Sequence, residues 1–402
     1  MQTQSIFPDP PSKRRSAIPR EVTAGERAVT VAWDDGHASR FHWLWLRHNC
    51  RCDKCWNKLG DQTLQVVVNI PQDIVPKSTS LDDEGRLVLA WPQDDHVTVY
   101  EAGWLRAHCY SAEERRKRRH TPTLWDANYV KDLPVFERGD IEVGNLGNLQ
   151  VLEQLRDYGI ARIKGAAPVP DEIERLAELI GYIRETNYGR FLDVVTKPSP
   201  KILAYTPEYL SVHSDDPYRD LPPGFGIFHC IEADSVGGDS ILVDGFKVAD
   251  ALRKENPGAF EILSRVPQQY SRYHEDDVDF RYEARMISID YWGEISGFRY
   301  ADRPIAPLDI QEELVEPFYD AFRKLSELTR RPEFEIRFRL TPGDVLLFDN
   351  HRVLHGRSGI SGRRHLRTCY FEREVFRSRL RILGRQFGRG DYGLTMAGGA
   401  MA

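Results

Sequence analysis

Two short stretches, far apart in the sequence, carry side chains that could bind one metal ion together. His213 and Asp215 are separated by a single residue, and residues i and i+2 of a β-strand point to the same face of the sheet. A second histidine would complete a set of two imidazoles and one carboxylate, the ligand set of non-haem Fe(II) oxygenases. We predict that this histidine is His355, with His351 as the rival candidate. Such a set leaves coordination positions open for a bidentate 2-oxo acid and for dioxygen.

A His-x-Asp pair alone is a weak signal, so the neighbouring residues must support it. Arg364 follows His355 by nine residues, and a planar guanidinium can hold the distal carboxylate of 2-oxoglutarate through two hydrogen bonds. In a strand, Arg364 and Leu366 would share a face. Ser240, at the end of a Gly-Gly-Asp-Ser sequence, could place a hydroxyl beside the same carboxylate. The alternative for any one arginine here is an ion pair at the surface or between domains.

A cluster of three cysteines indicates a second metal site. Cys50, Cys52 and Cys55 lie within six residues of one another. Without a secretion signal, clustered cysteines are more typical of metal binding than of disulfide bonds. Zn²⁺ in structural sites takes four nitrogen or sulfur ligands. Three histidines could supply the fourth ligand: His48, His96 and His108.

We predict that His96 is the fourth ligand. His48 is too close to the cysteines in sequence to wrap back easily, whereas His96 follows a turn in a repeated segment. A closed site of four ligands has no open position, so it would serve folding and not catalysis. The alternative is a group of reduced cysteines without a metal.

The composition is that of an ordinary globular protein, with 402 residues, 41% hydrophobic and 29% charged, and a net charge of −6. This charge gives no reason to expect a nucleic-acid partner, and the basic run 115–119 is offset by Glu113 and Glu114. No apolar run is long enough to span a membrane, and residues 1–20 lack the apolar core of a secretion signal. We expect a cytoplasmic protein, or a mitochondrial one if the source is a eukaryote.

The pattern of hydrophobic and turn-forming residues predicts two domains. Residues 1–22 are Pro-rich and are expected to be a disordered tail, and residues 23–118 a small strand-rich zinc-binding domain. Residues 119–135 are polar and contain proline, which is typical of a linker. The second domain covers residues 136–402. In the first domain, strands are expected at 29–33, 64–68 and 87–91.

Two segments of the first domain resemble each other. Each has a tryptophan, a turn, a histidine and then a Trp-Leu-Arg sequence before a cysteine. The histidines are His37 and His96, and the cysteines are Cys50 and Cys109. The pattern indicates an internal duplication that is too short for a solenoid.

In the second domain, short apolar strands alternate with longer insertions. Strands are predicted at 159–163, 225–231, 240–243 and 344–348, and helices at 148–158, 171–183, 246–255 and 310–329. Short strands with a few helices outside favour a double-stranded β-helix (jelly roll) over a parallel α/β sheet. We therefore predict a mainly β protein with flanking helices (α+β), in which a jelly-roll domain follows the small β-rich zinc domain.

On these motifs the chain resembles the γ-butyrobetaine hydroxylase and trimethyllysine hydroxylase group of Fe(II)/2-oxoglutarate dioxygenases, within the wider taurine dioxygenase family. The motifs cover most of the chain: the cysteine cluster with Asp95-His96, Leu203-Ala204-Tyr205-Thr206, His213-Ser214-Asp215, Gly237-Gly238-Asp239-Ser240, and Asn350-x4-His355-Gly356-Arg357 with Arg364-His365-Leu366. The resemblance implies a homodimer that acts on a small molecule with 2-oxoglutarate and O₂. It implies 2-oxoglutarate at Arg364, Fe(II) at His213, Asp215 and His355, and Zn²⁺ at Cys50, Cys52, Cys55 and His96.

The substrates of this group carry a trimethylammonium group, which aromatic rings hold through cation–π attraction. By position in the resemblance, the cage would consist of Tyr188, Tyr205 and Tyr370. Leu192 stands where a cage tryptophan is usual, and Ile202 where an asparagine is usual.

Two further departures from the family pattern bear on the substrate. Asp216 stands where a tyrosine is usual and could meet an α-ammonium group. Arg299 lies near the position of substrate-binding asparagines and could hold a strongly anionic group.

We therefore expect hydroxylation of a small betaine-like quaternary ammonium compound, as in the γ-butyrobetaine hydroxylases. The alternatives within this chemistry are trimethyllysine, a trimethylammonium phosphonate, or another small amine or amino acid. A different class of function is a non-catalytic binding protein with a zinc module and a degenerate jelly roll, and the intact His213, Asp215 and His355 set argues against it.

Overall fold

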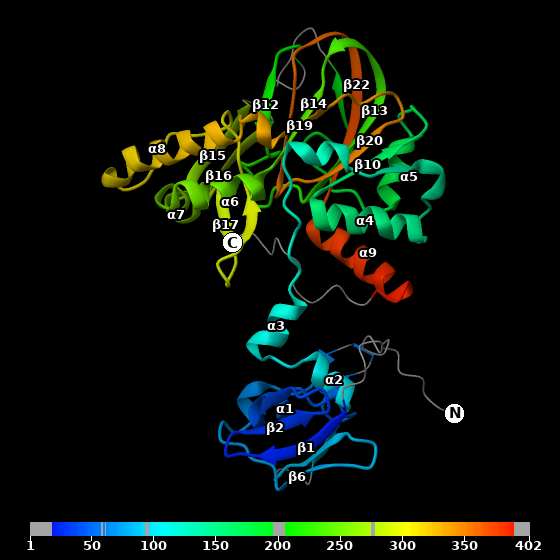
Figure 1. Cartoon of the computed structure of the whole chain (residues 1–402), viewed down its shortest axis with the longest axis vertical. Helices are drawn as coiled ribbons and strands as arrows, with labels where there is room; N and C mark the ends of the chain where they lie inside the picture. The colour runs from blue at the N-terminus through cyan, green and yellow to red at the C-terminus, as the bar shows by residue number, and fades with distance from the viewer. Residues whose placement is uncertain are drawn as a thin grey trace. The chain divides into compact units, whose positions relative to one another are not determined.

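The computed structural model describes residues 18–57, 59–60, 62–92, 96–195, 206–274 and 278–389. The chain divides between Arg119 and His120 into two compact units, labelled by element in Figure 1. Among the described residues, no helix is long and apolar enough to cross a membrane.

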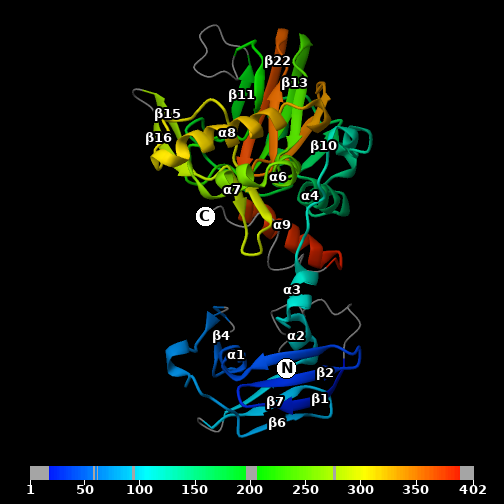
Figure 2. The ribbon, with the colours of Figure 1, turned by 60° about the vertical axis from the view of Figure 1, so that its left-hand side comes forward.

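The first unit contains one arrangement twice, three antiparallel strands followed by a short helix (Figure 2). The first copy is β1 (Pro19–Ala24), β2 (Ala28–Trp33), β3 (Ala38–His42) and α1 (Trp43–His48). The second copy is β6 (Ser78–Leu81), β7 (Leu87–Ala90), β8 (Val97–Tyr100) and α2 (Ala102–Ala107). The remaining elements are β4 (Trp56–Asn57), β5 (Gln62–Thr63), the 3₁₀ helix η1 (Val67–Asn69) and α3 (Ala112–Arg118).

Alternating apolar residues explain why each copy folds. Along and just after each middle strand, every second residue is buried in a shared core: Val29, Val31 and Trp33 in one copy, and Leu87, Leu89 and Trp91 in the other. This is the period of two that a half-buried strand requires.

Two sequence-based predictions for this unit are wrong. The apolar run 64–68 is not a strand, because no neighbouring strand pairs with it; η1 begins within it, and Val68 is 81% exposed. Residues 19–22 are expected to belong to the tail, but they form most of β1, in which Glu21 pairs with Ala32 of β2. A strand at the edge of a sheet is fixed by its partner and needs no strong apolar pattern of its own.

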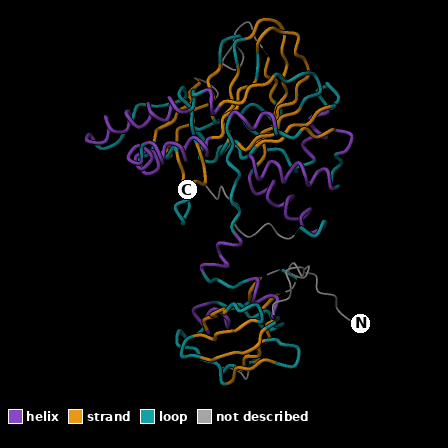
Figure 3. The backbone as a smooth tube through the Cα atoms, viewed as in Figure 1, coloured by secondary structure: helices purple, strands orange, loops and turns teal. Residues whose placement is uncertain are grey.

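The second unit is a jelly roll, as predicted, with strands from distant parts of the chain in two sheets (Figure 3). The larger sheet has the order β11 (Leu192–Val195), β22 (Ile360–Phe371), β13 (Phe225–Gly237), β20 (Val345–Asp349), β10 (Ile160–Lys164) and β9 (Val135–Glu137). The smaller sheet has the order β12 (Leu210–His213), β21 (Val353–Arg357), β14 (Ser240–Asp244) and β19 (Glu335–Phe338). Two further pairs are β15 (Gln268–His274) with β16 (Val278–Ala284), and β17 (Ile287–Ile289) with β18 (Ile295–Phe298).

Helices cover the outer faces of both sheets. Against the larger sheet pack α4 (Leu146–Tyr158), α5 (Glu172–Glu178) and α9 (Arg373–Gln386), with α4 and α9 side by side (Figure 1). Against the smaller sheet pack α6 (Gly245–Glu255), α7 (Pro257–Arg265) and α8 (Glu312–Leu328). Short 3₁₀ helices are η2 (Ala127–Lys131), η3 (Arg138–Asp140) and η5 (Pro332–Phe334). The predicted helix 171–183 is shorter than expected, because the chain turns at Gly181, whose φ of 149° no helix accepts.

The predicted linker 119–135 belongs to the second unit from His120 onwards. Trp125 is buried, its amide donates to Oδ2 of Asp244, and its indole donates to the carbonyl of Tyr158. The buried guanidinium of Arg352 donates to the carbonyl of Thr123. The polar composition of this segment did not indicate its packing, which rests on a few apolar residues such as Trp125 and Tyr129.

Candidate active site

The two histidines of the predicted metal site meet because β12 pairs with β21, with an irregularity in register between Leu210 and His213. His213 is the last residue of β12 and lies directly opposite His355 of β21. Asp215 follows in the next turn, and its Oδ1 lies 3.5 Å from Nε2 of His213 and 3.4 Å from Nε2 of His355. The ligand atoms of the three residues lie within 4.8 Å of one another. Donors of this type and spacing fit one Fe(II) ion.

Hydrogen bonds orient two of the three candidate metal-binding side chains, His213 and Asp215. Nδ1 of His213 donates to the carbonyl of Ser211 (2.9 Å). The lone pair of Nε2 is therefore available to a metal ion. The hydroxyl of Tyr370 donates to Oδ2 of Asp215 (2.8 Å), which leaves Oδ1 toward the histidines. The side chain of Asn350 accepts from the Asp215 amide (2.7 Å) and donates to the Asp215 carbonyl (3.0 Å), so it fixes the turn. Such outer contacts normally set the geometry of metal ligands.

The electrostatics of Asp215 and His355 suit a cation. Burial alone would raise the pKa of Asp215, but His355 and His213 hold it far below its ordinary value, so the carboxylate is ionised. Burial lowers the pKa of His355, which favours the neutral imidazole that a metal needs. For His213, burial acts to lower the pKa, but the neighbouring Asp215 carboxylate outweighs this effect, so the pKa of the ring is raised.

His351 is not part of this cluster. Its Nε2 donates to the carbonyl of Pro222 (3.2 Å), and burial lowers the pKa of the ring to about 3. The ring is therefore neutral and serves the packing of the loop that precedes β13. The rival to His355 is thereby removed.

A cavity lies between the two sheets beside the three donors. Besides His213, Asp215 and His355, it is lined by Tyr188, Leu192, Val194, Leu210, Asp216, Phe228, Ser240, Leu242, Leu346, Gly356, Arg357, Arg364, Leu366, Thr368 and Tyr370. Four of these are alternate residues of β22, which explains why Arg364 and Leu366 share a face. Most of the walls are apolar, so charged groups inside interact with little screening.

Arg364 and Thr368 offer polar groups to a ligand in this cavity. Burial, with the nearby charge of Arg357, lowers the pKa of Arg364 only to about 10, so the guanidinium is charged at neutral pH. Within the described ranges, this guanidinium donates no hydrogen bond, and Oγ1 of Thr368 is buried without a partner. A carboxylate of 2-oxoglutarate fits both groups, and Ser240 lines the same cavity.

The predicted substrate residues have different positions. Tyr188 lines the cavity, and its hydroxyl is 3.2 Å from that of Tyr218. Asp216 lines it as well, but its carboxylate accepts hydrogen bonds from Tyr218 (2.6 Å) and from Nε of Arg219 (2.7 Å). Asp216 also has a φ of 50°, which is uncommon for a non-glycine residue. Tyr205 lies outside the described residues.

The prediction for Arg299 is corrected. Arg299 does not line the cavity in the described part of the chain, and it is buried with its guanidinium donating to the carbonyls of Pro217, Arg219 and Asp220. A guanidinium with these partners holds the loop that follows the metal cluster. Sequence position alone could not show that backbone carbonyls would meet it.

The sequence predicts no role for three residues of the site: Thr368, Asn350 and Arg357. Thr368 could have been found by stepping along β22 from Arg364 in twos. Asn350 and Arg357 flank His355 in the sequence, but their partners lie in loops that no spacing predicts.

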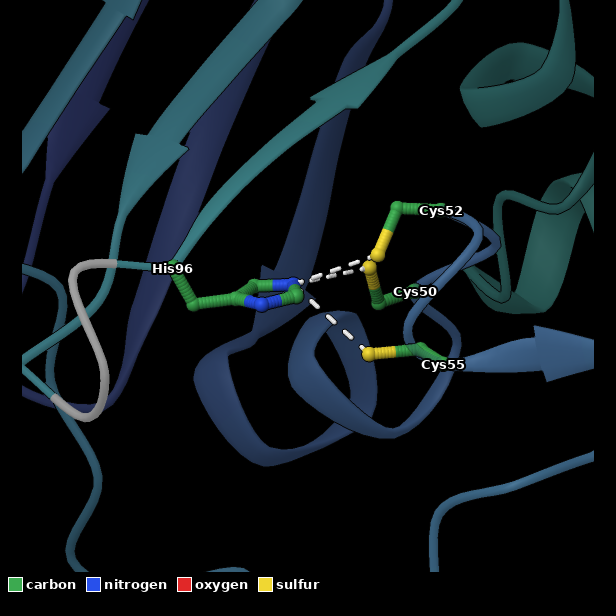
Figure 4. Close-up of side chains that lie close together, drawn as sticks. All are labelled: Cys50, Cys52, Cys55 and His96. Carbon is green, nitrogen blue, oxygen red and sulfur yellow. Dashed lines mark hydrogen bonds between the residues drawn. The ribbon is translucent and has the colours of Figure 1, made fainter.

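The four predicted zinc ligands meet in the first unit (Figure 4). Nε2 of His96 lies 3.3 Å from Sγ of Cys50 and 3.6 Å from those of Cys52 and Cys55. Gln65 donates to Sγ of Cys55 (2.6 Å), as expected around a thiolate. The set is compatible with tetrahedral Zn²⁺.

A jelly roll that carries this three-donor cluster beside a cavity with a charged arginine defines an Fe(II)/2-oxoglutarate-dependent dioxygenase. The model of the Taurine catabolism dioxygenase TauD, TfdA family matches residues 130–370, and that of the Gamma-butyrobetaine hydroxylase-like N-terminal domain matches residues 20–91. The chain belongs to the TauD, TfdA family of dioxygenases.

Relatives resemble this chain over nearly its whole length. It is 37% identical over 363 residues to the γ-butyrobetaine dioxygenase of Pseudomonas sp. (strain AK-1), covering 89% of this chain and 94% of the relative. It is 32% identical to the γ-butyrobetaine dioxygenase of Homo sapiens, covering 92% and 98%. It is 33% identical to the mitochondrial trimethyllysine dioxygenase of Homo sapiens, covering 95% of each.

Proposed function

We propose that this dioxygenase hydroxylates a small betaine-like quaternary ammonium compound, with γ-butyrobetaine as the leading candidate. In this proposal His213, Asp215 and His355 bind Fe(II), and Arg364 holds 2-oxoglutarate with the help of Ser240. The site in the first unit, Cys50, Cys52, Cys55 and His96, holds a structural Zn²⁺.

The observation that carries the substrate proposal is the position of two tyrosines. Tyr188 and Tyr370 line the same cavity as the three metal donors. A quaternary ammonium group cannot donate a hydrogen bond, so aromatic faces are the groups that recognise it best. The names of the relatives support the same substrate class.

The contacts of two charged residues favour γ-butyrobetaine over the alternatives. Trimethyllysine carries an α-ammonium group, and Asp216 would be its partner, but Arg219 already balances that carboxylate. A phosphonate would call for Arg299, and three backbone carbonyls already occupy its guanidinium. A substrate with one quaternary cation and one carboxylate needs neither residue.

When bound, Fe(II) supplies the chemistry that couples decarboxylation of 2-oxoglutarate to oxidation of a C–H bond by dioxygen. The contribution of the protein is position. Tyr370 and Asn350 fix the orientation of Asp215. Phe228 and Phe348 pack against the His355 ring, with centroids 5.3 and 4.7 Å away, and exclude water from that side.

The test is substrate-dependent release of succinate from 2-oxoglutarate by the full chain with Fe(II). The panel contains γ-butyrobetaine, trimethyllysine, a trimethylammonium phosphonate and a neutral analogue of γ-butyrobetaine in which carbon replaces nitrogen. We expect γ-butyrobetaine to stimulate release most and the neutral analogue to have little effect, because it lacks the cation. Equal stimulation by the neutral analogue would contradict recognition by the tyrosines.

The same assay decides between an enzyme and a non-catalytic binding protein. If the iron-loaded chain bound a quaternary amine yet released no succinate with any compound of the panel, the binding role would be favoured. The close approach of the three donors supports the enzyme.

We also propose a homodimer, on the strength of the resemblance to the γ-butyrobetaine hydroxylase group. Light scattering at micromolar concentration measures this, and a monomeric mass would contradict it. For the compartment we propose the cytoplasm, or the mitochondrion if the source is a eukaryote, as for the mitochondrial relatives. Imaging of the tagged chain in its source cell tests this.

A further inference from the structure

The duplication in the first unit brings the histidine of each copy to the cysteine of the other. Nε2 of His96, from the second copy, lies 3.3 Å from Sγ of Cys50, which follows the helix of the first. Nε2 of His37, from the first copy, lies 3.3 Å from Sγ of Cys109, which follows the helix of the second. Positions 37 and 96, and positions 50 and 109, are both 59 residues apart. The two pairs are therefore equivalent.

The hydrogen bonds around the two pairs repeat in the same way. The indole of Trp33 donates to Oγ of Ser39 at 2.9 Å, and that of Trp91 donates to Oγ1 of Thr98 at 2.9 Å. Ser39 and Thr98 lie in β3 and β8, the strands that directly follow the two histidines.

The turn after the cysteine repeats as well. The amide of Trp56 donates to the carbonyl of Cys52 (3.0 Å), and the amide of Arg115 donates to the carbonyl of Ser111 (2.9 Å). Both pairs are again 59 residues apart. Ser111 therefore stands at the position of the second cysteine ligand.

By the same register, Glu114 stands at the position of Cys55. Its side chain is only 4% exposed and forms ion pairs with Arg106 (3.2 Å) and Lys117 (2.9 Å). In the first copy Arg47, which corresponds to Arg106, donates to Sγ of Cys55 (3.4 Å). An equivalent arginine thus contacts the equivalent ligand position in both copies.

We propose that the second copy contains a former metal site, in which His37 and Cys109 remain as ligand-type residues. Ser111 and Glu114 have replaced two thiolates, and the basic side chains around Glu114 supply the positive charge that a metal ion would bring. The native first unit accordingly binds one Zn²⁺. Because the backbone hydrogen bond of the ligand turn recurs in the second copy, restoring the two thiolates should give a second tetrahedral Zn²⁺ site.

The direct test is the variant Ser111→Cys/Glu114→Cys of the full chain. All samples also carry His355→Ala, so that zinc cannot occupy the iron site. We expect zinc by elemental analysis, after dialysis against a weak chelator, to rise from one to two per chain. Cobalt substitution should double the thiolate charge-transfer absorption. Ser111→Ala/Glu114→Ala is the matched control and should retain one zinc ion per chain. Adding His37→Ala to the cysteine variant should remove the second zinc ion.

A folded cysteine variant that retains one zinc would overturn the proposal, as would a second zinc that persists without His37. A converse experiment applies if the cysteine variant does not fold. Cys52→Ser/Cys55→Glu recreates the ion-pair version in the first copy, where Arg47 already stands in place. It should contain no zinc and melt at a higher temperature than zinc-free Cys52→Ala/Cys55→Ala. Equal melting temperatures would count against the proposed replacement of metal by charge.

Discussion

The hydroxyl of Tyr370 donates a 2.8 Å hydrogen bond to Oδ2 of Asp215, so a residue of the proposed substrate cage also holds a proposed iron ligand. Burial raises the pKa of Tyr370 well above its ordinary value, and the hydroxyl therefore remains a donor at any physiological pH. The aromatic face and the hydroxyl of one side chain thus serve two functions that substitution can separate.

Tyr370→Phe keeps the ring and removes the donor. Outer contacts to metal ligands are typically worth about 10–100-fold in metal affinity, so we expect weaker binding of Fe(II) with a nearly unchanged KM for the substrate. Tyr370→Leu should also raise that KM, because the aromatic face is lost. Iron titration and steady-state kinetics on both variants measure this. Wild-type iron affinity in Tyr370→Phe would refute the role of the hydroxyl.

His355→Ala should abolish succinate formation, because two ligands remain of the proposed three. The side chain is buried in the jelly roll and far in sequence from the cysteine cluster, so the zinc content should not change. Activity near that of the wild type would contradict the ligand assignment. His351→Asn is the control, and it should retain iron binding because the His351 ring donates to the carbonyl of Pro222 and lies outside the cluster of three proposed metal ligands.

Arg364→Met should raise the KM for 2-oxoglutarate by about 10–100-fold, since a hydrogen bond to a charged group contributes about 1.5–3 kcal/mol. Arg363→Met is the matched control on the neighbouring residue. Its side chain is 79% exposed and pairs with Glu232, so we expect almost no change. A similar effect of both substitutions would show that overall charge, and not a specific contact, binds the cosubstrate.

Removal of zinc should destabilise the first unit selectively. A metal that binds only the folded state contributes its binding free energy to folding. Treatment with a strong chelator, or Cys55→Ser, should therefore lower the temperature at which this unit unfolds. Zn²⁺ added back after chelation should restore it, whereas Mg²⁺ should not. An unchanged thermal transition in zinc-free protein would contradict a structural zinc.

Arg352→Met should destabilise the second unit by about 3–5 kcal/mol, because it leaves a buried carboxylate without its partner. Arg352 and Asp244 form a 2.8 Å ion pair with side chains 2% and 0% exposed. The exposed pair of Lys254 with Asp250 is the comparison, and Lys254→Met should cost less than about 1 kcal/mol. Denaturant titration measures both, and equal losses would contradict the argument from burial.

The sequence predicted those parts of the structure that local pattern determines. The strands predicted at 225–231, 240–243 and 344–348 correspond to β13, β14 and β20, because short apolar runs between turn residues are typical of buried strands. Helix α4 ends at Gly159, which adopts the left-handed conformation that commonly ends helices. The meeting of His213 and His355 was predicted from chemistry, because two imidazoles and one carboxylate form the ligand set of a non-haem Fe(II) oxygenase and the neighbouring motifs supported it.

What the sequence could not predict depends on contacts between distant loops. Arg299 is an example, since its charge suggested an anionic ligand, while three carbonyls of the loop after Asp216 are its partners. The segment before β9 is another, because its packing depends on Trp125 meeting Asp244 across 119 residues. The apolar run at 64–68 had strand-forming residues but no strand to pair with.

Strand β22 carries Arg364 at one position and Tyr370 six residues later, on the same face. Six residues of extended chain span about 20 Å, so the backbone itself sets how far the cosubstrate anchor lies from the aromatic ring. Insertion of a single residue between them would rotate one of the two side chains to the opposite face. Evolution can therefore vary the substrate of this scaffold by exchanging side chains or loops, but a change in the length of β22 would uncouple its two ends.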